Sequence, residues 1–158
     1  MIQRIQNLYL FLAAICALLT FFLPYAHFYA AQELLAEYAI FGLQNVQSKS
    51  EIASGAYAVP AWSIAALTFA VCVLALSLFK KRPVQYRITR LAFLLHLTYV
   101  VYLFFAIENL AETHFGEDIR ILHHVGFYLP VAALPLCFLA VRGIKKDEAL
   151  VKSLDRIR

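Results

Sequence analysis

Apolar residues fill four long stretches of the chain, and polar residues are confined to the segments between them. The four stretches cover residues 5–28, 58–79, 88–107 and 121–141. Each is close to the length of about 20 residues that a helix needs to cross the hydrocarbon core of a bilayer. The pattern predicts an all-α integral membrane protein, built as a four-helix bundle that crosses the membrane four times.

The basic residues are divided unequally between the two predicted faces. Four crossings bring both termini to one face, and twelve of the fourteen Lys and Arg residues fall on that face. Only Lys49 and Arg120 fall on the other. The positive-inside rule therefore places both termini in the cytoplasm. The net charge of +4 follows from this topology; it indicates attraction to anionic lipids and requires no nucleic-acid partner.

The chain divides into a membrane domain and a short tail. Residues 1–143 form the predicted transmembrane domain, with an outer loop at 29–57. In residues 144–158, apolar residues recur at helical spacing along one face and charged residues lie at the two ends, which predicts a short amphipathic cytoplasmic C-terminal helix. The stripe is formed by Leu150, Val151, Leu154 and Ile157. Such a helix is expected to lie on the membrane surface or to dock onto a partner.

The connecting segments refine the topology. In residues 30–49, apolar residues recur at helical spacing, which predicts a short helix on the outer leaflet; an extended segment over 38–46 is the alternative. The basic turn before Pro83 is short, so the second and third helices are expected to be antiparallel neighbours. Pro130 and Pro135 each remove a backbone donor, which predicts a kink or a local opening in the fourth helix.

Three cysteines, Cys16, Cys72 and Cys137, lie in the first, second and fourth predicted helices. They form no CxxC pair, which argues against a thiol-oxidising enzyme, and the simplest interpretation is that they are packing residues. At 1.5 Å per residue, Cys72, His96 and Cys137 lie at similar depths, where a metal or haem site is an alternative. For His96 a structural hydrogen bond between helices is the main interpretation, and quinone binding, haem ligation and proton transfer are the alternatives.

A second group of ionisable residues lies at the predicted outer boundary. Imidazole and carboxylate groups there could bind a divalent metal or sense an acidic exterior, although hydrated boundary residues are the simpler interpretation. The group comprises His27, Glu108, Glu112, His123 and His124. The sequence contains no catalytic triad pattern and no phosphate-binding glycine loop, so no enzymatic activity and no cofactor are predicted.

Three segments resemble a known family. The opening MIQRIQ, the segment RITRLAFLL and the ending IKKDEALVKSLDRIR are similar to domain-of-unknown-function family 4293, small four-span membrane proteins of Bacteroidota. The resemblance extends over essentially the whole chain. It implies a bacterial inner-membrane protein with four helices and both ends in the cytoplasm, and it implies no catalytic residues.

The sequence favours a non-enzymatic accessory or scaffold subunit of a membrane complex. Its basic hairpin and tail are expected to bind lipid, a membrane or cytoplasmic protein, or a second copy of the chain. The predicted contact residues are Arg87, Arg90, Lys145, Lys146, Asp147, Glu148, Arg156 and Arg158. The alternative is a redox-associated membrane protein that binds quinone, haem or metal through His96 or the outer histidines.

Overall fold

A computed structural model describes residues 2–30, 33–46, 51–53, 59–79, 81–116 and 119–155. This part of the chain is mostly helical, with four helices and a small antiparallel sheet. The elements in chain order are α1 (Ile2–Leu19), β1 (Ala26–Ala30), β2 (Glu33–Ala39), β3 (Gly42–Asn45), β4 (Glu51–Ala53), α2 (Ala61–Ser77), α3 (Arg82–Phe115), β5 (Arg120–His123) and α4 (Val125–Asp155).

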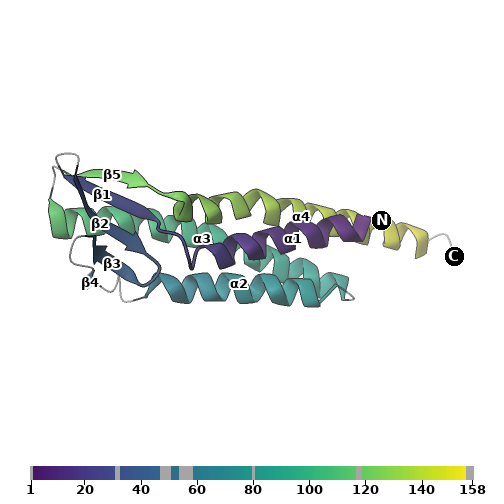
Figure 1. The fold of residues 1–158 in the computed structure, drawn as a ribbon. Coiled ribbons are helices and arrows are strands. Elements are labelled where there is room, and N and C mark those ends of the chain that lie inside the picture. The colour runs from purple at the N-terminus through teal and green to yellow at the C-terminus, as the bar shows by residue number, and fades with distance from the viewer. Residues whose placement is uncertain are drawn as a thin grey trace.

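The four helices lie side by side in an up-down-up-down bundle (Figure 1). Contacts follow a closed ring, because α1 packs on α2 and α4, and α3 packs on the same two helices. The sheet lies at one end of the bundle, the sheet end, while α1 begins and α4 ends at the other, the terminal end (Figure 1). Only four residues separate Ser77 from Arg82. The predicted tight hairpin between antiparallel neighbours is therefore confirmed.

Each helix buries a stripe of residues that repeats alternately every four and every three positions. In α4 this stripe runs through Cys137, Ala140, Ile144 and Asp147, all of which are buried. In α2 it runs through positions 61, 65, 68, 72 and 75. A mean spacing of 3.5 residues is that of helices crossing at about 20°, and the many alanines let the helices approach closely.

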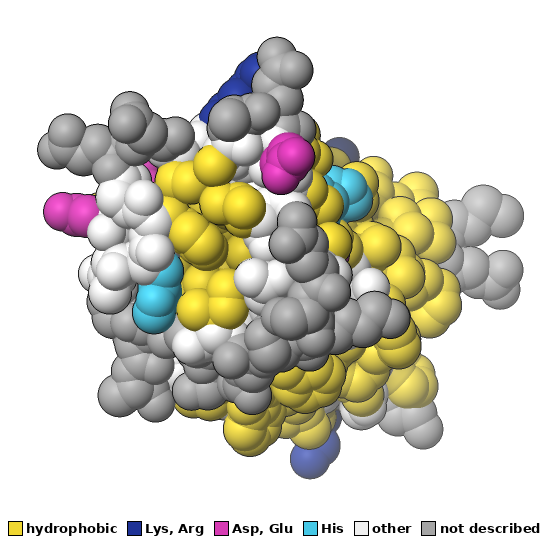
Figure 2. Space-filling view, turned by 60° about the vertical axis from the view of Figure 1, so that its left-hand side comes forward, with side chains coloured by type: hydrophobic (Ala, Val, Ile, Leu, Met, Phe, Trp, Pro, Cys, Tyr) yellow, Lys and Arg dark blue, Asp and Glu magenta, His cyan; other side chains and the backbone are white. Residues whose placement is uncertain are grey.

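The outer surface of the bundle is strongly apolar. Figure 2 shows hydrophobic side chains over the flank of the helices behind the sheet end. Large exposed side chains occur on all four helices, including Leu8, Phe11, Leu67, Leu74, Leu94, Phe105 and Phe138. Two helical segments, Arg82–Phe115 and Val125–Ala149, are long and apolar enough to cross a membrane, and only 33% and 28% of their most apolar windows are buried. In α1 and α2 the apolar segments are shorter.

The sheet has the strand order β4-β3-β2-β1-β5, and all described neighbours are antiparallel. Within β1, Ala26 pairs with Tyr38 of β2 on one side and with His123 of β5 on the other. Tyr25, Phe28 and Tyr38 share a buried core with residues from α2 and from the sheet-end half of α3. The sheet is thus continuous with the bundle rather than a separate domain.

The sheet corrects the predicted all-α class. The helix predicted over residues 5–28 ends at Leu19, and residues 26–30 form β1; the helix predicted over 121–141 begins at Val125. These short apolar segments pair with each other across about 95 positions of sequence, which a local periodicity cannot reveal. Strands β2 and β3 show that the extended alternative for residues 38–46 is correct and that the helix on the outer leaflet is wrong.

The C-terminal tail is also different from the prediction. Helix α4 continues without a break from Val125 to Asp155, through Pro130 and Pro135. Residues 144 onward therefore extend the fourth helix and do not begin a separate one, because Ile144 and Asp147 belong to the same buried stripe. The predicted contact residues Arg156 and Arg158 lie outside the described residues.

Candidate metal centre

Three metal-ligating side chains meet inside the bundle, each from a different helix. Cys72 comes from α2, His96 from α3 and Cys137 from α4, and all three are completely buried. One donor atom from each lies within 4.8 Å of the other two. Among the described residues, this is the only group of three or more His, Cys, Asp or Glu side chains placed to share an ion.

Hydrogen bonding fixes how His96 presents its ring. Its Nδ1 atom lies 2.9 Å from the backbone oxygen of Ala92. A carbonyl oxygen can only accept, so Nδ1 carries the proton and donates it, which leaves the lone pair on Nε2. The Nε2 atom is buried and has no hydrogen-bond partner. Metal-ligating histidines commonly show this arrangement, in which one ring nitrogen is anchored to a carbonyl and the other binds the ion.

Small side chains surround the cluster and bring its helices close together. Ala13, Ala92 and Ala133 are fully buried in the same layer. Cys16 of α1 packs against this layer and is partly buried, so every helix places one Cys or His at or next to the site. None of the three cysteines forms a disulfide.

The donor set has a clear metal preference. Thiolate sulfur binds zinc at about 2.3 Å and imidazole nitrogen at about 2.0–2.1 Å, so donors that share one ion lie about 4 Å apart. A separation within 4.8 Å needs only small side-chain adjustments to reach that geometry. Thiolate and imidazole ligands together select soft or borderline ions such as Zn²⁺ and Cu⁺ over Mg²⁺ or Ca²⁺.

The prediction that Cys72, His96 and Cys137 lie at similar depths is confirmed, and the structure adds that they face one another. These three residues face one another because each lies on the buried stripe of its helix. A hydrogen bond from His96 to another helix, the main expectation, is not present among the described residues; its partner is within its own helix.

Two residues of the predicted outer site lie together in the structure, and the other three do not join them to form a group of three donors. His27 lies on β1, where its Nε2 atom is 3.7 Å from a carboxylate oxygen of Glu37, and its ring stacks on that of His124 with centroids 4.5 Å apart. His123 instead packs on Phe127. The side chains of Glu108 and Glu112 are exposed on α3. Within the described residues, these five side chains do not gather three donors around one point.

The environment of His27 lowers the pKa of its ring. Burial lowers the pKa of His27 below its usual value, the nearby His124 lowers it further, and the carboxylate of Glu37 opposes both effects. Because burial is the largest of these influences, the ring of His27 binds a proton less readily in the folded sheet than in an unfolded chain. The stacked histidine pair is therefore a feature of the folded state that acid would disrupt.

The residues predicted to contact lipid or a partner have different environments. Arg87, Arg90, Lys145 and Lys146 are exposed at the terminal end, and Glu148 is partly buried. Asp147 is only 7% exposed. It lines a cavity of about 210 Å³ together with residues that the sequence analysis had not singled out, namely Gln6, Asn7, Phe79, Arg82, Gln85 and Ile144. The 3.5-residue spacing of buried positions places Gln85 and Asp147 on buried stripes, and this spacing could have identified them as buried polar residues.

Comparison with known proteins supports the sequence resemblance. A family model described as Domain of unknown function (DUF4293) matches residues 2–157, nearly the whole chain. No curated protein and no solved structure matches the chain.

Proposed function

We propose a function for this chain, which belongs to the DUF4293 family: it is a multi-pass inner-membrane protein that binds one thiophilic metal ion inside its bundle. Both termini lie in the cytoplasm, and Cys72, His96 and Cys137 are the ligands. The convergence of three buried donor atoms from three helices carries this proposal.

The apolar exterior supports the membrane location. Large hydrophobic side chains remain exposed on all four helices, and a soluble protein rarely exposes so extensive an apolar surface. A helix of 17 residues such as α2 is about 26 Å long, close to the hydrocarbon thickness of about 30 Å. The shorter helices can therefore cross together with α3 and α4.

The distribution of charge supports the orientation. At the terminal end, exposed basic residues come from both the α2–α3 hairpin and α4, including Lys81, Arg87, Arg90, Arg142 and Lys145. At the sheet end the described basic residue is Arg120. By the positive-inside rule, the terminal end faces the cytoplasm and the sheet faces the periplasm.

Charge balance supports a divalent ion at the site. A buried charge in a low-dielectric environment is costly unless it is compensated. Two thiolates from Cys72 and Cys137 carry two negative charges, and a neutral His96 adds none. A divalent ion makes this site neutral overall, and it also satisfies the Nε2 atom that lacks a partner in the protein.

Metal analysis of the purified protein tests this proposal. Protein extracted from its own membrane in mild detergent should contain about one zinc or copper ion per chain. Cys72→Ser and Cys137→Ser should each reduce the bound metal strongly, because two remaining protein donors hold an ion poorly. Cys16→Ser is the matched control, since Cys16 lies outside the group of three donors and its loss should leave most of the metal bound.

Folding must be monitored alongside metal content. Each variant should elute as the wild-type species in gel filtration and keep its helical circular dichroism. A wild-type protein that binds neither zinc nor copper after both are supplied would refute the proposal. Equal metal content in wild type and in a folded Cys72→Ser, Cys137→Ser double variant would refute it as well.

A second candidate function is that of an accessory subunit, and the length of α4 favours it. This helix projects beyond the start of α1 at the terminal end (Figure 1). Because Ile144 and Asp147 are part of the bundle, a deletion that tests the projecting segment should remove residues 150–158 only. We expect this truncated protein to stay folded and to lose a co-purifying membrane or cytoplasmic protein; an unchanged set of co-purifying proteins would exclude the segment as their binding site.

A further inference from the structure

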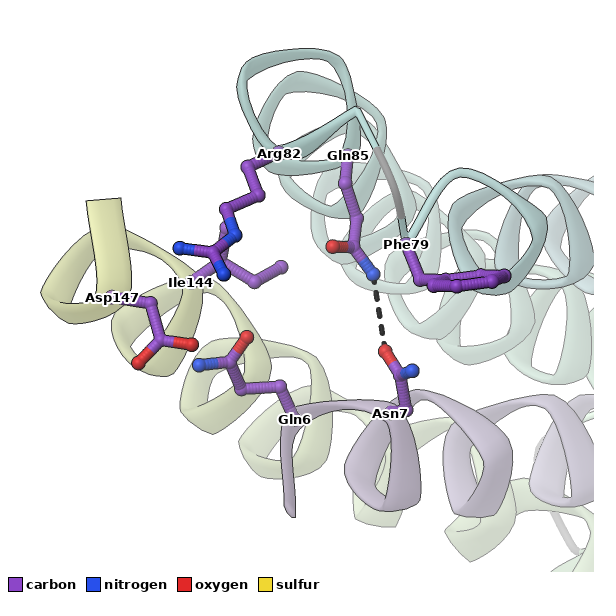
Figure 3. Close-up of a pocket in the computed structure, with 7 residues that line it drawn as sticks. All are labelled: Gln6, Asn7, Phe79, Arg82, Gln85, Ile144 and Asp147. Atoms are coloured by element: carbon purple, nitrogen blue, oxygen red, sulfur yellow. Dashed lines mark hydrogen bonds between the residues drawn. The ribbon is translucent and has the colours of Figure 1, made fainter. Parts of the chain in front are cut away.

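A polar cavity opens at the terminal end of the bundle, and its walls come from α1, α3, α4 and the turn between α2 and α3. Gln6 and Asn7 come from α1, Arg82 and Gln85 from the start of α3, and Asp147 from α4. The cavity measures about 210 Å³, and the apolar ring of Phe79 forms part of its wall. Figure 3 shows the guanidinium of Arg82, the carboxylate of Asp147 and the amide of Gln6 around the same space.

The amide of Gln6 is unusual because it is buried without being satisfied. Gln6 is 5% exposed, and its Nε2 atom has no hydrogen-bond partner. Its side chain packs where Gly143 of α4 leaves room, since a Cβ at that glycine would lie 2.7 Å from Cγ of Gln6. Leaving a buried donor without a partner is unfavourable, so this position favours a bound ligand that accepts a hydrogen bond.

The neighbouring amides are fixed in position. The Nε2 atom of Gln85 donates to Oδ1 of Asn7 over 3.2 Å, which joins α3 to α1 at the edge of the cavity (Figure 3). Asp147 is 7% exposed, so its carboxylate faces the cavity more than solvent. The described residues that line the cavity thus offer one fixed anion, one cation with several donors, and an unsatisfied amide donor.

We propose that this cavity binds the headgroup of a zwitterionic phospholipid, one with a phosphate and a primary ammonium group, as in phosphatidylethanolamine. The phosphate lies at Arg82 and the Nε2 donor of Gln6, and the ammonium group lies at Asp147. This assignment rests on the proposed membrane orientation, which places the cavity at the level of the cytoplasmic headgroups. It does not depend on metal binding.

The paired charges distinguish this site from a general attraction to anionic lipid. Exposed lysines such as Lys145 and Lys146 attract any acidic headgroup. Inside the cavity, the carboxylate of Asp147 repels a headgroup that carries only negative charge and attracts one that ends in an ammonium group. The side chain of Phe79 is 51% exposed and apolar, which suits contact with the lipid beyond the headgroup.

Native mass spectrometry of the delipidated protein in detergent tests this site. Phosphatidylethanolamine and phosphatidylglycerol of matched acyl chains are added in equal amounts, and the fraction of protein carrying each lipid is measured. The wild type should bind phosphatidylethanolamine preferentially. Asp147→Asn should reduce that preference about tenfold or more, because it removes the charge that pairs with the ammonium group while keeping the shape of the side chain.

Two controls make the outcomes decisive. Lys145→Gln removes an exposed charge from the same region of α4 and should keep the preference for phosphatidylethanolamine. Glycerophosphoethanolamine, a soluble molecule with the same headgroup, is offered in a separate arm. Equal binding of both lipids by the wild type, or an unchanged preference in folded Asp147→Asn protein, would overturn the proposal. Binding of the soluble molecule without a preference between the lipids would overturn the assignment to a lipid.

The proposal can fail independently of the proposed function. Membrane fractionation reports whether the protein is embedded in the bilayer, and metal content reports on the cluster of Cys72, His96 and Cys137. A protein that passes both tests but shows no lipid preference would contradict the headgroup site alone.

Discussion

The bundle interior and the sheet-end core bury polar groups in contrasting ways. At the sheet end, the hydroxyls of Tyr25 and Tyr99 lie 2.7 Å apart, and the Tyr25 hydroxyl also lies 3.3 Å from the backbone oxygen of Thr20. The Tyr25 and Tyr99 hydroxyls satisfy one another within the chain, while the buried Tyr38 hydroxyl of the same core has no hydrogen-bond partner among the described residues. In the bundle, the Nε2 atom of His96 remains without a partner next to two buried thiols. The hydrogen-bonded pair of Tyr25 and Tyr99 supports the fold, whereas the cluster, in which three donor atoms converge, is suited to a ligand.

The two regions also differ in how they fill space. Large aromatic side chains, Tyr25, Phe28 and Tyr38, are fully buried between the sheet and the helices. Around the Cys and His cluster the buried residues are mainly alanines, which bring the helices together without themselves filling a large volume. Small residues therefore set the spacing between the helices of the bundle. Cys72, His96 and Cys137 supply the metal-ligating groups of the site.

Substituting two glycines of α4 should reveal the largest difference in stability between the sheet end and the terminal end. A Cβ at Gly126 would clash with the backbone oxygens of Leu23 and Pro24, whereas a Cβ at Gly143 would meet only the flexible side chain of Gln6. Gly126→Ala should therefore destabilise the protein by about 1–3 kcal/mol, because the backbone of the turn must shift. Gly143→Ala is the matched control, and it should cost less because the Gln6 side chain can move.

Thermal unfolding in mild detergent, followed by circular dichroism, measures both glycine variants. The expected order of melting temperature is wild type, then Gly143→Ala, then Gly126→Ala. Equal stability of Gly126→Ala and wild type would show that the close contact between the start of α4 and the Pro24 turn is not a constraint on the sheet end.

A smaller effect is expected from acid, and it should be confined to the sheet end. The pKa of His27 is lowered in the folded protein, mainly by burial, so the unfolded chain binds a proton more readily. Below the ordinary histidine pKa of about 6.5, the unfolded state therefore gains protons first, and the stability of the sheet should fall as pH decreases. Above that pH the effect should be absent.

Hydrogen exchange at amides of β1 and β2 between pH 7 and pH 5 would measure this effect, after correction for the intrinsic pH dependence of exchange. His27→Gln should reduce the loss of protection, since its side chain does not titrate. Amides in the bundle serve as the internal control. A uniform loss of protection in the sheet and the bundle, unchanged in His27→Gln, would contradict a local role for this histidine.

The sequence was sufficient to predict the four helices, their order and the tight turn before α3. These features follow from long apolar runs and from the basic segment that ends one of them. The strands could not be predicted in the same way, because β1 and β5 are the apolar ends of stretches that continue into α1 and α4. A short apolar run has no periodicity that separates a strand from a helix, and its partner lies far along the chain.

The candidate site was only partly predictable, because the sequence gives the depth of a residue along a helix but not the direction in which its side chain faces. Counting along the helices placed Cys72, His96 and Cys137 at one depth, but depth does not fix rotation about the helix axis. The buried stripes supply that rotation, since all three residues fall on them. Whether the outer histidines meet could not be read from the sequence, because it depends on the pairing of β1 with β5, which brings His27 next to His124.

X-ray absorption at the metal edge of the protein, purified from its own membrane, would test the central proposal most directly. For bound zinc, the account predicts two sulfur neighbours at about 2.3 Å and an imidazole nitrogen at about 2.0–2.1 Å. The sulfur signal should disappear in the Cys72→Ser, Cys137→Ser double variant. A first shell of oxygen and nitrogen alone in the wild type would place the ion elsewhere and contradict a metal site between α2, α3 and α4.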